Sequence, residues 1–223
     1  MIQTPGAIAR VPKLFEGKTA ALLASGPSLT PRQVWECAQA GWALFGCNNQ
    51  CIYALDVLWA PDMEWLDIVD PRRVEHIPHR FTTATRGQRQ QRQNPPRFRA
   101  NWQYLETDPN IVWSDMPSKL ARGQHAGYQL INLAGLAGCK RLVLLGYDGR
   151  RVKQADGTRA RHWFGVHPGH LNKKSKFDEF NQNYLQLPDT LADRGIEVIN
   201  ATENSAIEAF ERASLADCIN RWA

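Results

Sequence analysis

The sequence predicts an α/β fold, a doubly wound and mostly parallel Rossmann-like sheet with an arginine-rich insertion. Two observations predict it: apolar runs of strand length alternate with helical patterns, and polar residues follow several of these runs. With 223 residues and 43% hydrophobic content, the chain is long enough to bury a sizeable core. We therefore expect one domain over residues 1–223, with 70–115 as a lid or insertion.

The first strand–turn–helix unit occupies residues 19–35, where an apolar run stops at the sequence Ser-Gly-Pro-Ser and a helical pattern follows. Either Ser28 or Thr30 is expected to cap the helix, whose free N–H groups then attract phosphate. A tight connection without a ligand is the other interpretation, because βα turns are often only connections. The residues expected to bind an anion here are Ser25, Gly26, Pro27 and Ser28.

Two further apolar runs, Trp42–Cys47 and Asp56–Ala60, are expected strands that also end in polar residues. In an open parallel sheet, ligands lie outside the carboxyl ends of the strands. Each polar residue alone has a structural explanation, as part of a turn or as a helix cap. Their repetition at successive strand ends favours a shared crevice, which adds Asn48, Asn49 and Asp62 to the expected binding residues.

The segment 86–99 contains five arginines and no acidic residue, in a chain with a net charge of +5 and a pI of about 9.1. Arginine suits phosphate oxygens and extended nucleic acid backbones. A solvated loop is the alternative, since charge runs are usually solvated. We expect this segment to cover the crevice as part of the lid; its arginines are Arg86, Arg89, Arg92, Arg97 and Arg99.

A helix is predicted over 126–137, ended by Gly138, and an apolar strand over 141–146. The N–H groups at the start of this helix would face the crevice, together with the residues that follow the strand. His125 is either part of that surface or only an exposed side chain. The binding residues expected from these two elements are Gln124, His125, Gly127, Tyr147 and Asp148.

Three histidines, at 162, 167 and 170, lie in a segment rich in glycine and proline that follows a strand end. Their spacing matches no common zinc pattern, and neither does the pair Cys47 and Cys51, so we expect no metal site. An imidazole titrates near working pH and can accept a hydroxyl proton. One of these histidines is therefore a candidate general base. Lys173, Lys174 and Lys176 either contact a phosphate or only lie at the start of the next helix.

The C-terminal third predicts a helix from about Phe177 that Pro188 interrupts, and then a strand over 195–200. Asn204 or Ser205 is expected to cap a helix after that strand. The five cysteines are odd in number and scattered through apolar contexts, which is typical of reduced thiols in a cytoplasmic protein. No segment has the apolar length of a membrane span.

Five short motifs occur in a fixed order along the chain. They are Ala-Ser-Gly-Pro-Ser-Leu (24–29), Gly-Cys-Asn-Asn (46–49), His-Ala-Gly-Tyr (125–128), Leu-Leu-Gly-Tyr-Asp (144–148) and Asn-Ala-Thr-Glu-Asn-Ser-Ala (200–206). In order and spacing they resemble those of bacterial CMP-sialic-acid-dependent sialyltransferases and the related motility-associated factor glycosyltransferases. They are even more similar to the motifs of uncharacterised phage-encoded proteins. The resemblance covers most of the chain outside the arginine-rich middle.

The resemblance implies transfer of a sugar from a nucleotide-sugar to an acceptor hydroxyl. It places the nucleotide at the 26–28 turn and at Asn48 or Asn49. It implies a late histidine as general base, for which His167 and then His162 are the nearest equivalents here, with Tyr147 or Lys173 as candidate contacts of the leaving phosphate. Ser25 stands where those enzymes usually have asparagine, and no counterpart of their sialic-acid region is present, so the donor stays open. The resemblance to phage proteins and the arginine run make DNA one candidate acceptor, and an oligomer is compatible with the sequence.

We expect no tightly bound cofactor, with the nucleotide or nucleotide-sugar acting as co-substrate. Two other functions stay open. The 25–28 turn also looks similar to that of archaeal 6-hydroxymethylpterin diphosphokinases, which would use ATP and magnesium. Alternatively, the sheet is only a scaffold, and the arginine run makes the protein a non-enzymatic nucleic-acid-binding accessory factor.

Overall fold

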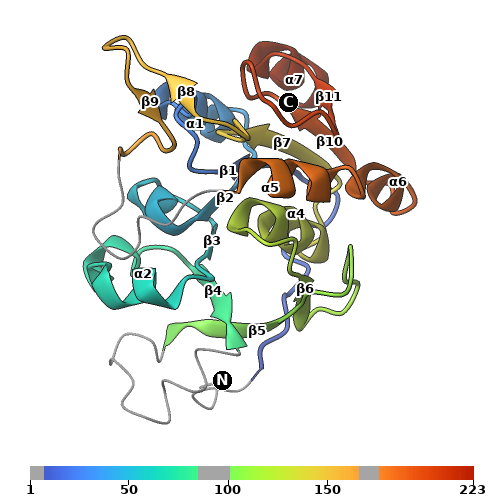
Figure 1. The fold of residues 1–223 in the computed structure, drawn as a ribbon. Coiled ribbons are helices and arrows are strands. Elements are labelled where there is room, and N and C mark those ends of the chain that lie inside the picture. Colours follow the sequence, from blue (N-terminus) through green and yellow to red (C-terminus); the bar gives the residue numbers. More distant parts are fainter. Residues whose placement is uncertain (1–7, 85–100, 166–175) are drawn as a thin grey trace.

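A nine-stranded sheet forms the centre of the molecule in a computed structural model that describes residues 8–84, 101–165 and 176–223. The strand order is β11-β10-β7-β1-β2-β3-β4-β5-β6, and every neighbouring pair is parallel (Figure 1). The strands are β1 (Thr19–Leu23), β2 (Ala43–Cys47), β3 (Val57–Trp59), β4 (His79–Thr83), β5 (Gln103–Asp108), β6 (Lys119–Ala121), β7 (Arg141–Leu145), β10 (Glu197–Asn200) and β11 (Glu211–Arg212).

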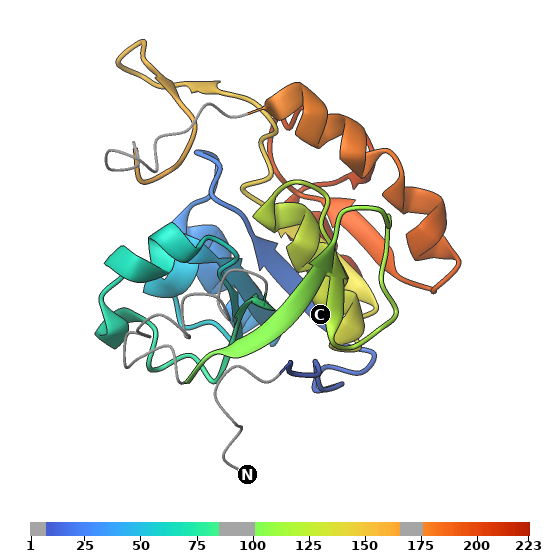
Figure 2. The same ribbon diagram turned by 60° about the horizontal axis from the view of Figure 1, so that its bottom comes forward.

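Helices cover both faces of this sheet, which confirms the predicted fold class (Figure 2). Strands β1 and β2 are buried along their whole length, as strands covered on both faces must be. Helices α4 (Ala126–Leu136), α5 (Phe177–Tyr184) and α6 (Leu187–Ala192) pack on one face, and α1 (Pro31–Gln39), α2 (Met63–Ile68) and α7 (Leu215–Trp222) pack on the other.

The helix of the first unit begins with a capping box. The Thr30 side chain accepts a hydrogen bond from the backbone N–H of Gln33, and the Gln33 side chain accepts one from the N–H of Thr30. Of the two expected caps, Thr30 is therefore the observed one. Ser28 instead donates a hydrogen bond to Asp148, which follows β7.

The order of the strands places a topological switch at β1. From β1 the chain moves outward through β2 to β6, and it then returns to β7 on the other side of β1. The carboxyl ends of all nine strands lie at one edge of the sheet because the strands are parallel. Ligands bind at such a switch point in open α/β sheets.

Two predictions about the chain's organisation need correction. Strands β4 and β5 fall within 70–115 and belong to the central sheet, so the described residues of this range, 70–84 and 101–115, are not a lid. Apolar side chains of both strands are buried. The arginine run between the two strands makes this part of the sequence look polar, so the strands were not predicted. The part that contains the arginine run, 85–100, lies outside the described residues.

The second correction concerns the segment after β10. Asn204 and Ser205 cap no helix; the chain continues to β11, and Ser214 caps α7. Asn204 has a φ of 54°, which turns the chain away from a helix at that point. The predicted interruption near Pro188 is confirmed, because α5 ends at Tyr184 and Pro188 lies in the first turn of α6.

A small antiparallel hairpin, β8 (Val152–Lys153) with β9 (Arg159–Ala160), projects from the body of the molecule after β7 (Figures 1 and 2). No helix among the described residues is both long and apolar enough to cross a lipid bilayer.

Candidate functional site

The turns that follow β1 and β7 are joined at the switch point. The Gly26 N–H donates to the Gly146 carbonyl oxygen at 2.9 Å. A Cβ at Gly26 would overlap both that oxygen and the Asp148 carboxylate, so the turn requires glycine for close approach. Ser28 Oγ donates to Asp148 Oδ2 at 2.8 Å. The two motifs therefore form one unit.

A cavity of about 220 Å³ opens beside this unit. The carboxyl ends of β1, β2 and β7 form one side of it, and the starts of α4 and α5 form the other. It is lined by eight of the predicted site residues: Ser25, Gly26, Asn48, His125, Gly127, Tyr147, Asp148 and His162.

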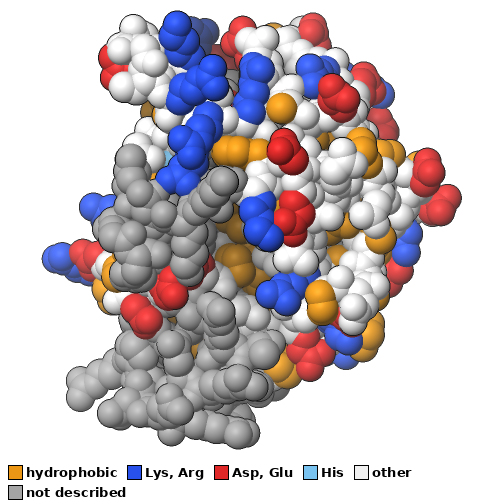
Figure 3. Space-filling view, in the orientation of Figure 1, with side chains coloured by type: hydrophobic (Ala, Val, Ile, Leu, Met, Phe, Trp, Pro, Cys, Tyr) orange, Lys and Arg blue, Asp and Glu red, His pale blue; other side chains and the backbone are white. Residues whose placement is uncertain are grey.

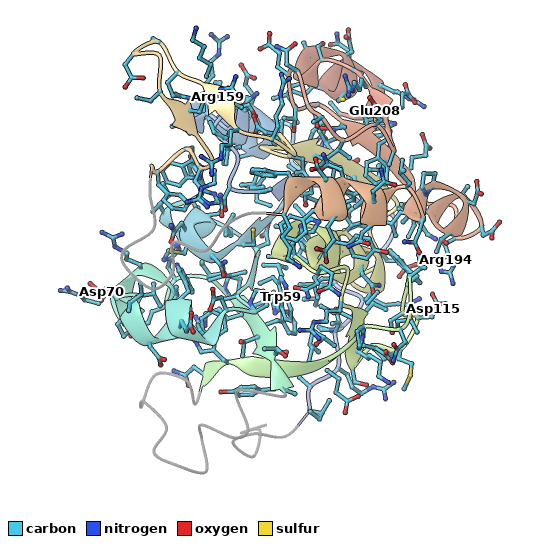
Figure 4. The ribbon with its side chains drawn as sticks, in the orientation of Figure 1. Trp59, Asp70, Asp115, Arg159, Arg194 and Glu208 are labelled. Atoms are coloured by element: carbon cyan, nitrogen blue, oxygen red, sulfur yellow. The ribbon has the colours of Figure 1, made fainter. Side chains whose placement is uncertain are left out.

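A second cavity, of about 520 Å³, adjoins the first and lies at the carboxyl ends of β3, β4 and β5. The two cavities share Asn48, His125 and Ala126. Trp59, at the end of β3, donates from Nε1 to Gln129 Oε1 at 2.8 Å and so fixes one wall (Figure 4). Polar side chains dominate the lining, among them Asp62, Thr83, Thr107, Gln124 and Gln129.

Three residues that line the first cavity each have a buried polar atom with no hydrogen-bond partner within the described residues. The atoms are Asn48 Oδ1, His125 Nε2 and Asn181 Oδ1. Buried polar atoms are almost always hydrogen-bonded, and each unsatisfied one costs about 1–3 kcal/mol. A polar ligand or ordered water beside these residues would satisfy such atoms.

His125 is the N-cap residue of α4, and its ring lies against aromatic side chains. The ring centroid is 4.8 Å from that of Phe180 and 4.9 Å from that of Tyr184. Burial among these groups lowers the pKa of His125 to about 3. The imidazole is therefore neutral at physiological pH, so His125 is a hydrogen-bonding group rather than a cation, and it is not the exposed side chain of the alternative prediction.

Asp148 lies in the wall between the turn and the cavity and is buried. Burial raises the pKa of its carboxyl group, and the hydrogen bonds from Ser28 oppose that rise. Tyr147 next to it is buried too, and its hydroxyl donates to the Gly127 carbonyl oxygen at 3.0 Å. This bond fixes the start of α4 against β7 and uses the hydroxyl proton of Tyr147.

His162 reaches the first cavity because the next residue, Trp163, is hydrogen-bonded to the turn that follows β1. The Trp163 N–H donates to the Ser25 carbonyl oxygen at 3.1 Å. The His162 ring stacks on Phe164 with a centroid distance of 4.9 Å and an interplanar angle of 3°. The other candidate base, His167, lies outside the described residues, as do Lys173 and Lys174.

Two residues at the junction of the cavities have left-handed backbone angles, Asn48 with φ of 50° and Gln124 with φ of 66°. Residues other than glycine adopt this region infrequently, and such strain concentrates at binding sites. Both residues line the second cavity. The strain supports the prediction that Asn48 and Gln124 belong to a site.

Several predicted residues have structural roles instead. Asn49 lines neither cavity, because its Oδ1 accepts a hydrogen bond from Trp65 Nε1 at 2.6 Å and thereby holds α2. Asp62 caps α2 through the Glu64 N–H, although it also lines the second cavity. Pro27 and Ser28 line neither cavity, and Lys176 pairs with Glu179 at 2.8 Å.

Sequence reasoning missed part of the site. Asn181 and Phe180 come from α5, well beyond the end of β9, and nothing in the sequence distinguishes them from ordinary residues of an amphipathic helix. Arg150 and Arg161 also line the first cavity. Their positive charge beside a βα turn is the signal that could have identified them.

The cysteines are free and buried, as the sequence predicted. Burial raises the pKa of Cys47 to about 12, and its Sγ lies 3.7 Å from the Leu23 carbonyl oxygen inside the core. Within the part of the chain that the structure describes, no three His, Cys, Asp or Glu residues are grouped to hold a metal ion.

No protein-family model matches the sequence, and no curated protein matches it. Among solved structures, the MAf glycosyltransferase from Magnetospirillum magneticum AMB-1 is similar, with a TM-score of 0.61 and 13% identity. The match covers 94% of this chain but 35% of that protein, so the chain spans about a third of its length. The sialyltransferase CstII from Campylobacter jejuni, solved with cytidine-5'-monophosphate, matches with a TM-score of 0.44 and 12% identity over 89% of this chain and 86% of that one. The fold of this chain is thus the one found in the MAf glycosyltransferase, as the resemblance of its motifs implied.

Proposed function

We propose that the protein transfers a sugar from a nucleotide-sugar to an acceptor hydroxyl. The observation that carries the proposal is the group of three residues with unsatisfied polar atoms that line the first cavity, at the switch point of a parallel sheet. The fold supports it, because the similar MAf protein is described as a glycosyltransferase. The proposal concerns glycosyl transfer in general, with donor sugar and nucleotide open.

The first cavity suits the nucleotide part of the donor. Arg150 and Arg161 bring positive charge to its lining, which favours phosphate oxygens. Asn48, His125 and Asn181 offer unsatisfied atoms for the ribose and the base. The adjoining second cavity offers mostly uncharged hydrogen-bonding side chains, which suit the hydroxyl groups of a sugar.

In the proposed reaction the acceptor oxygen attacks the anomeric carbon of the sugar. The bond from that carbon to the donor phosphate breaks, the electron pair leaves with the nucleotide, and the acceptor's proton passes to a histidine. His162 lines the first cavity and is one candidate base. His167 remains the other candidate from the sequence.

Titration calorimetry with CMP, CDP, UDP, GDP and ATP tests the proposal. We expect one of these nucleotides to bind, and Asn181→Ala to weaken its binding about fivefold, since a lost hydrogen bond is worth about 1 kcal/mol. Asn220→Ala is the matched control, because Asn220 is an exposed asparagine on α7. Failure of all five nucleotides to bind at millimolar concentration would overturn the proposal.

The alternative diphosphokinase function is separated by chelation. A diphosphokinase loses ATP turnover in EDTA because magnesium bridges the phosphates, whereas we expect nucleotide affinity here to survive EDTA. Release of AMP with a pyrophosphorylated product would assign the alternative reaction.

A further inference from the structure

The β8–β9 hairpin places like charges opposite each other. The pairing is antiparallel, and Lys153 lies directly across from Arg159 while Val152 lies across from Ala160. Like charges at directly opposite positions destabilise a two-stranded ribbon. A hairpin of two-residue strands has few contacts that offset this cost. The opposed cations Lys153 and Arg159 therefore indicate a role other than stabilising the hairpin.

Side chains alternate between the two faces of a strand, so the hairpin is two-sided. Val152 and Ala160 are half-buried on one face, and Lys153 and Arg159 are exposed on the other. Arg151 directly precedes β8, and Arg161 directly follows β9. One face of the hairpin is therefore cationic.

Four cations of the hairpin and its start are not neutralised by carboxylates. Within the described residues, Arg150, Arg151, Lys153 and Arg159 form no ion pair, whereas other exposed cations such as Arg32, Arg72 and Arg221 do. The acidic residue of the hairpin, Asp156, accepts hydrogen bonds from the backbone and hydroxyl of Thr158 in the turn, at 2.9 and 2.7 Å.

The cationic face leads to the first cavity. Figure 3 shows lysine and arginine side chains gathered over the hairpin and extending toward the centre of this view, and Figure 4 places Arg159 on the outer hairpin. Arg150 and Arg161, at the two ends of the hairpin, line the cavity. Beyond Arg161 the chain carries partly exposed aromatic rings, with Trp163 edge-on to Phe164 at 5.4 Å and 6.3 Å from Tyr53.

We propose that the hairpin binds the phosphodiester backbone of a nucleic acid and directs the strand toward the first cavity. Cationic side chains that follow a backbone, next to aromatic rings on which bases stack, are the two features that recognise nucleic acid strands. An acidic protein surface or a sulfated glycan would use the cations but not the rings. Only the further step, that the nucleic acid is the sugar acceptor, rests on the proposed function.

The test compares two double variants of the full chain with the same loss of charge. Lys153→Gln with Arg159→Gln removes the opposed pair; Lys13→Gln with Lys18→Gln removes two exposed lysines that precede β1, at the opposite edge of the sheet. Fluorescence anisotropy with a labelled single-stranded and a labelled double-stranded oligonucleotide at several salt concentrations gives the slope of log affinity against log salt for each protein.

We expect the first variant to lower the magnitude of that slope by about 2 on duplex, or slightly less on a single strand, and the control to leave it unchanged. The charge-conserving variant Lys153→Arg with Arg159→Lys keeps the slope. Arg151→Gln changes a residue outside the strands and lowers the magnitude of the slope by about 1. This single variant replaces the double variant if the double variant does not fold.

An unchanged slope in the hairpin variant, or an equal loss in the control, overturns the proposal. So does dextran sulfate that competes as well as unlabelled oligonucleotide at matched charge, which would assign the face to a sulfated glycan. The two proposals can be overturned independently. Nucleotide titration of the same variants measures binding in the cavity, and oligonucleotide anisotropy measures binding to the hairpin.

Discussion

Gly26 sets how closely β1 and β7 approach at their carboxyl ends. Its φ is not positive, so a larger residue is excluded by space and not by backbone angle. Asp148 and the Gly146 carbonyl oxygen occupy that space, and Ser28 holds the carboxylate in it. At the scale of single residues, the site therefore depends on Gly26 having no side chain.

We expect Gly26→Ala to lower the free energy of unfolding by about 2 kcal/mol or more and to weaken nucleotide binding, because the added Cβ displaces the Asp148 carboxylate. Urea unfolding monitored by circular dichroism measures the first effect. Gly41→Ala is the control: Gly41 has a φ of 71° but nothing near its Cβ position, so it loses about 1 kcal/mol from backbone strain alone. Equal losses in the two variants would contradict the steric explanation.

His125 makes stability depend on pH. Its pKa falls from 6.5 in the unfolded chain to about 3 in the folded protein, so between these values the unfolded state binds the extra proton. Stability should therefore fall as pH drops from 6.5 toward 3, by up to about 1.4 kcal/mol per pH unit from this residue. His125→Phe should flatten that part of the urea-midpoint profile. Profiles that coincide for wild type and His125→Phe would contradict the assignment.

At the scale of elements, two helices that follow strands of the site, α1 and α2, begin at a residue whose side chain caps them, whereas α4 and α5 have no side-chain cap. Thr30 caps α1, and Asp62 caps α2 just after β3. These caps fix where the helical N–H groups lie relative to the strand ends. The same local rule was wrong after β10, where Asn204 turns the chain toward β11 instead.

We expect Thr30→Ala to destabilise the protein by about 1 kcal/mol through loss of the capping box. Arg32→Ala in the same helix removes an exposed ion pair with Glu36 and should cost no more than about 0.5 kcal/mol. Chemical unfolding of both variants measures the two losses in the free energy of unfolding. An effect of Thr30→Ala no larger than that of Arg32→Ala would show that the cap is not needed.

At the scale of the whole molecule, nine parallel strands bring residues from distant parts of the sequence to one edge. Asn48, His125 and Asn181 follow or precede different elements, yet all three line the same cavity, and each has an unsatisfied polar atom. Because such atoms cost stability when unpaired, a ligand that pairs them stabilises the folded state.

We therefore expect the nucleotide that binds best to raise the melting temperature by about 5–10 °C at a hundredfold excess over its Kd, the equivalent of about 2.7 kcal/mol. Differential scanning fluorimetry measures the shift. At the same nucleotide concentration the variant Asn48→Ala with Asn181→Ala should show a smaller shift, and Asn220→Ala should match the wild type. An unreduced shift in the cavity variant would place the nucleotide elsewhere.

The sequence by itself determined the alternation of strands and helices, the turn at Gly26 and eight residues of the first cavity, because periodicity, glycine and caps act over a few neighbouring positions. Only the tertiary structure decided which polar residues face the cavity and which hold a helix. Asn48 and Asn49 are adjacent, yet one lines both cavities while the other accepts the hydrogen bond from Trp65. Likewise Asn181 enters the site only because α5 packs beside α4 over the sheet. Such choices depend on contacts between residues far apart in the chain, which no local pattern records.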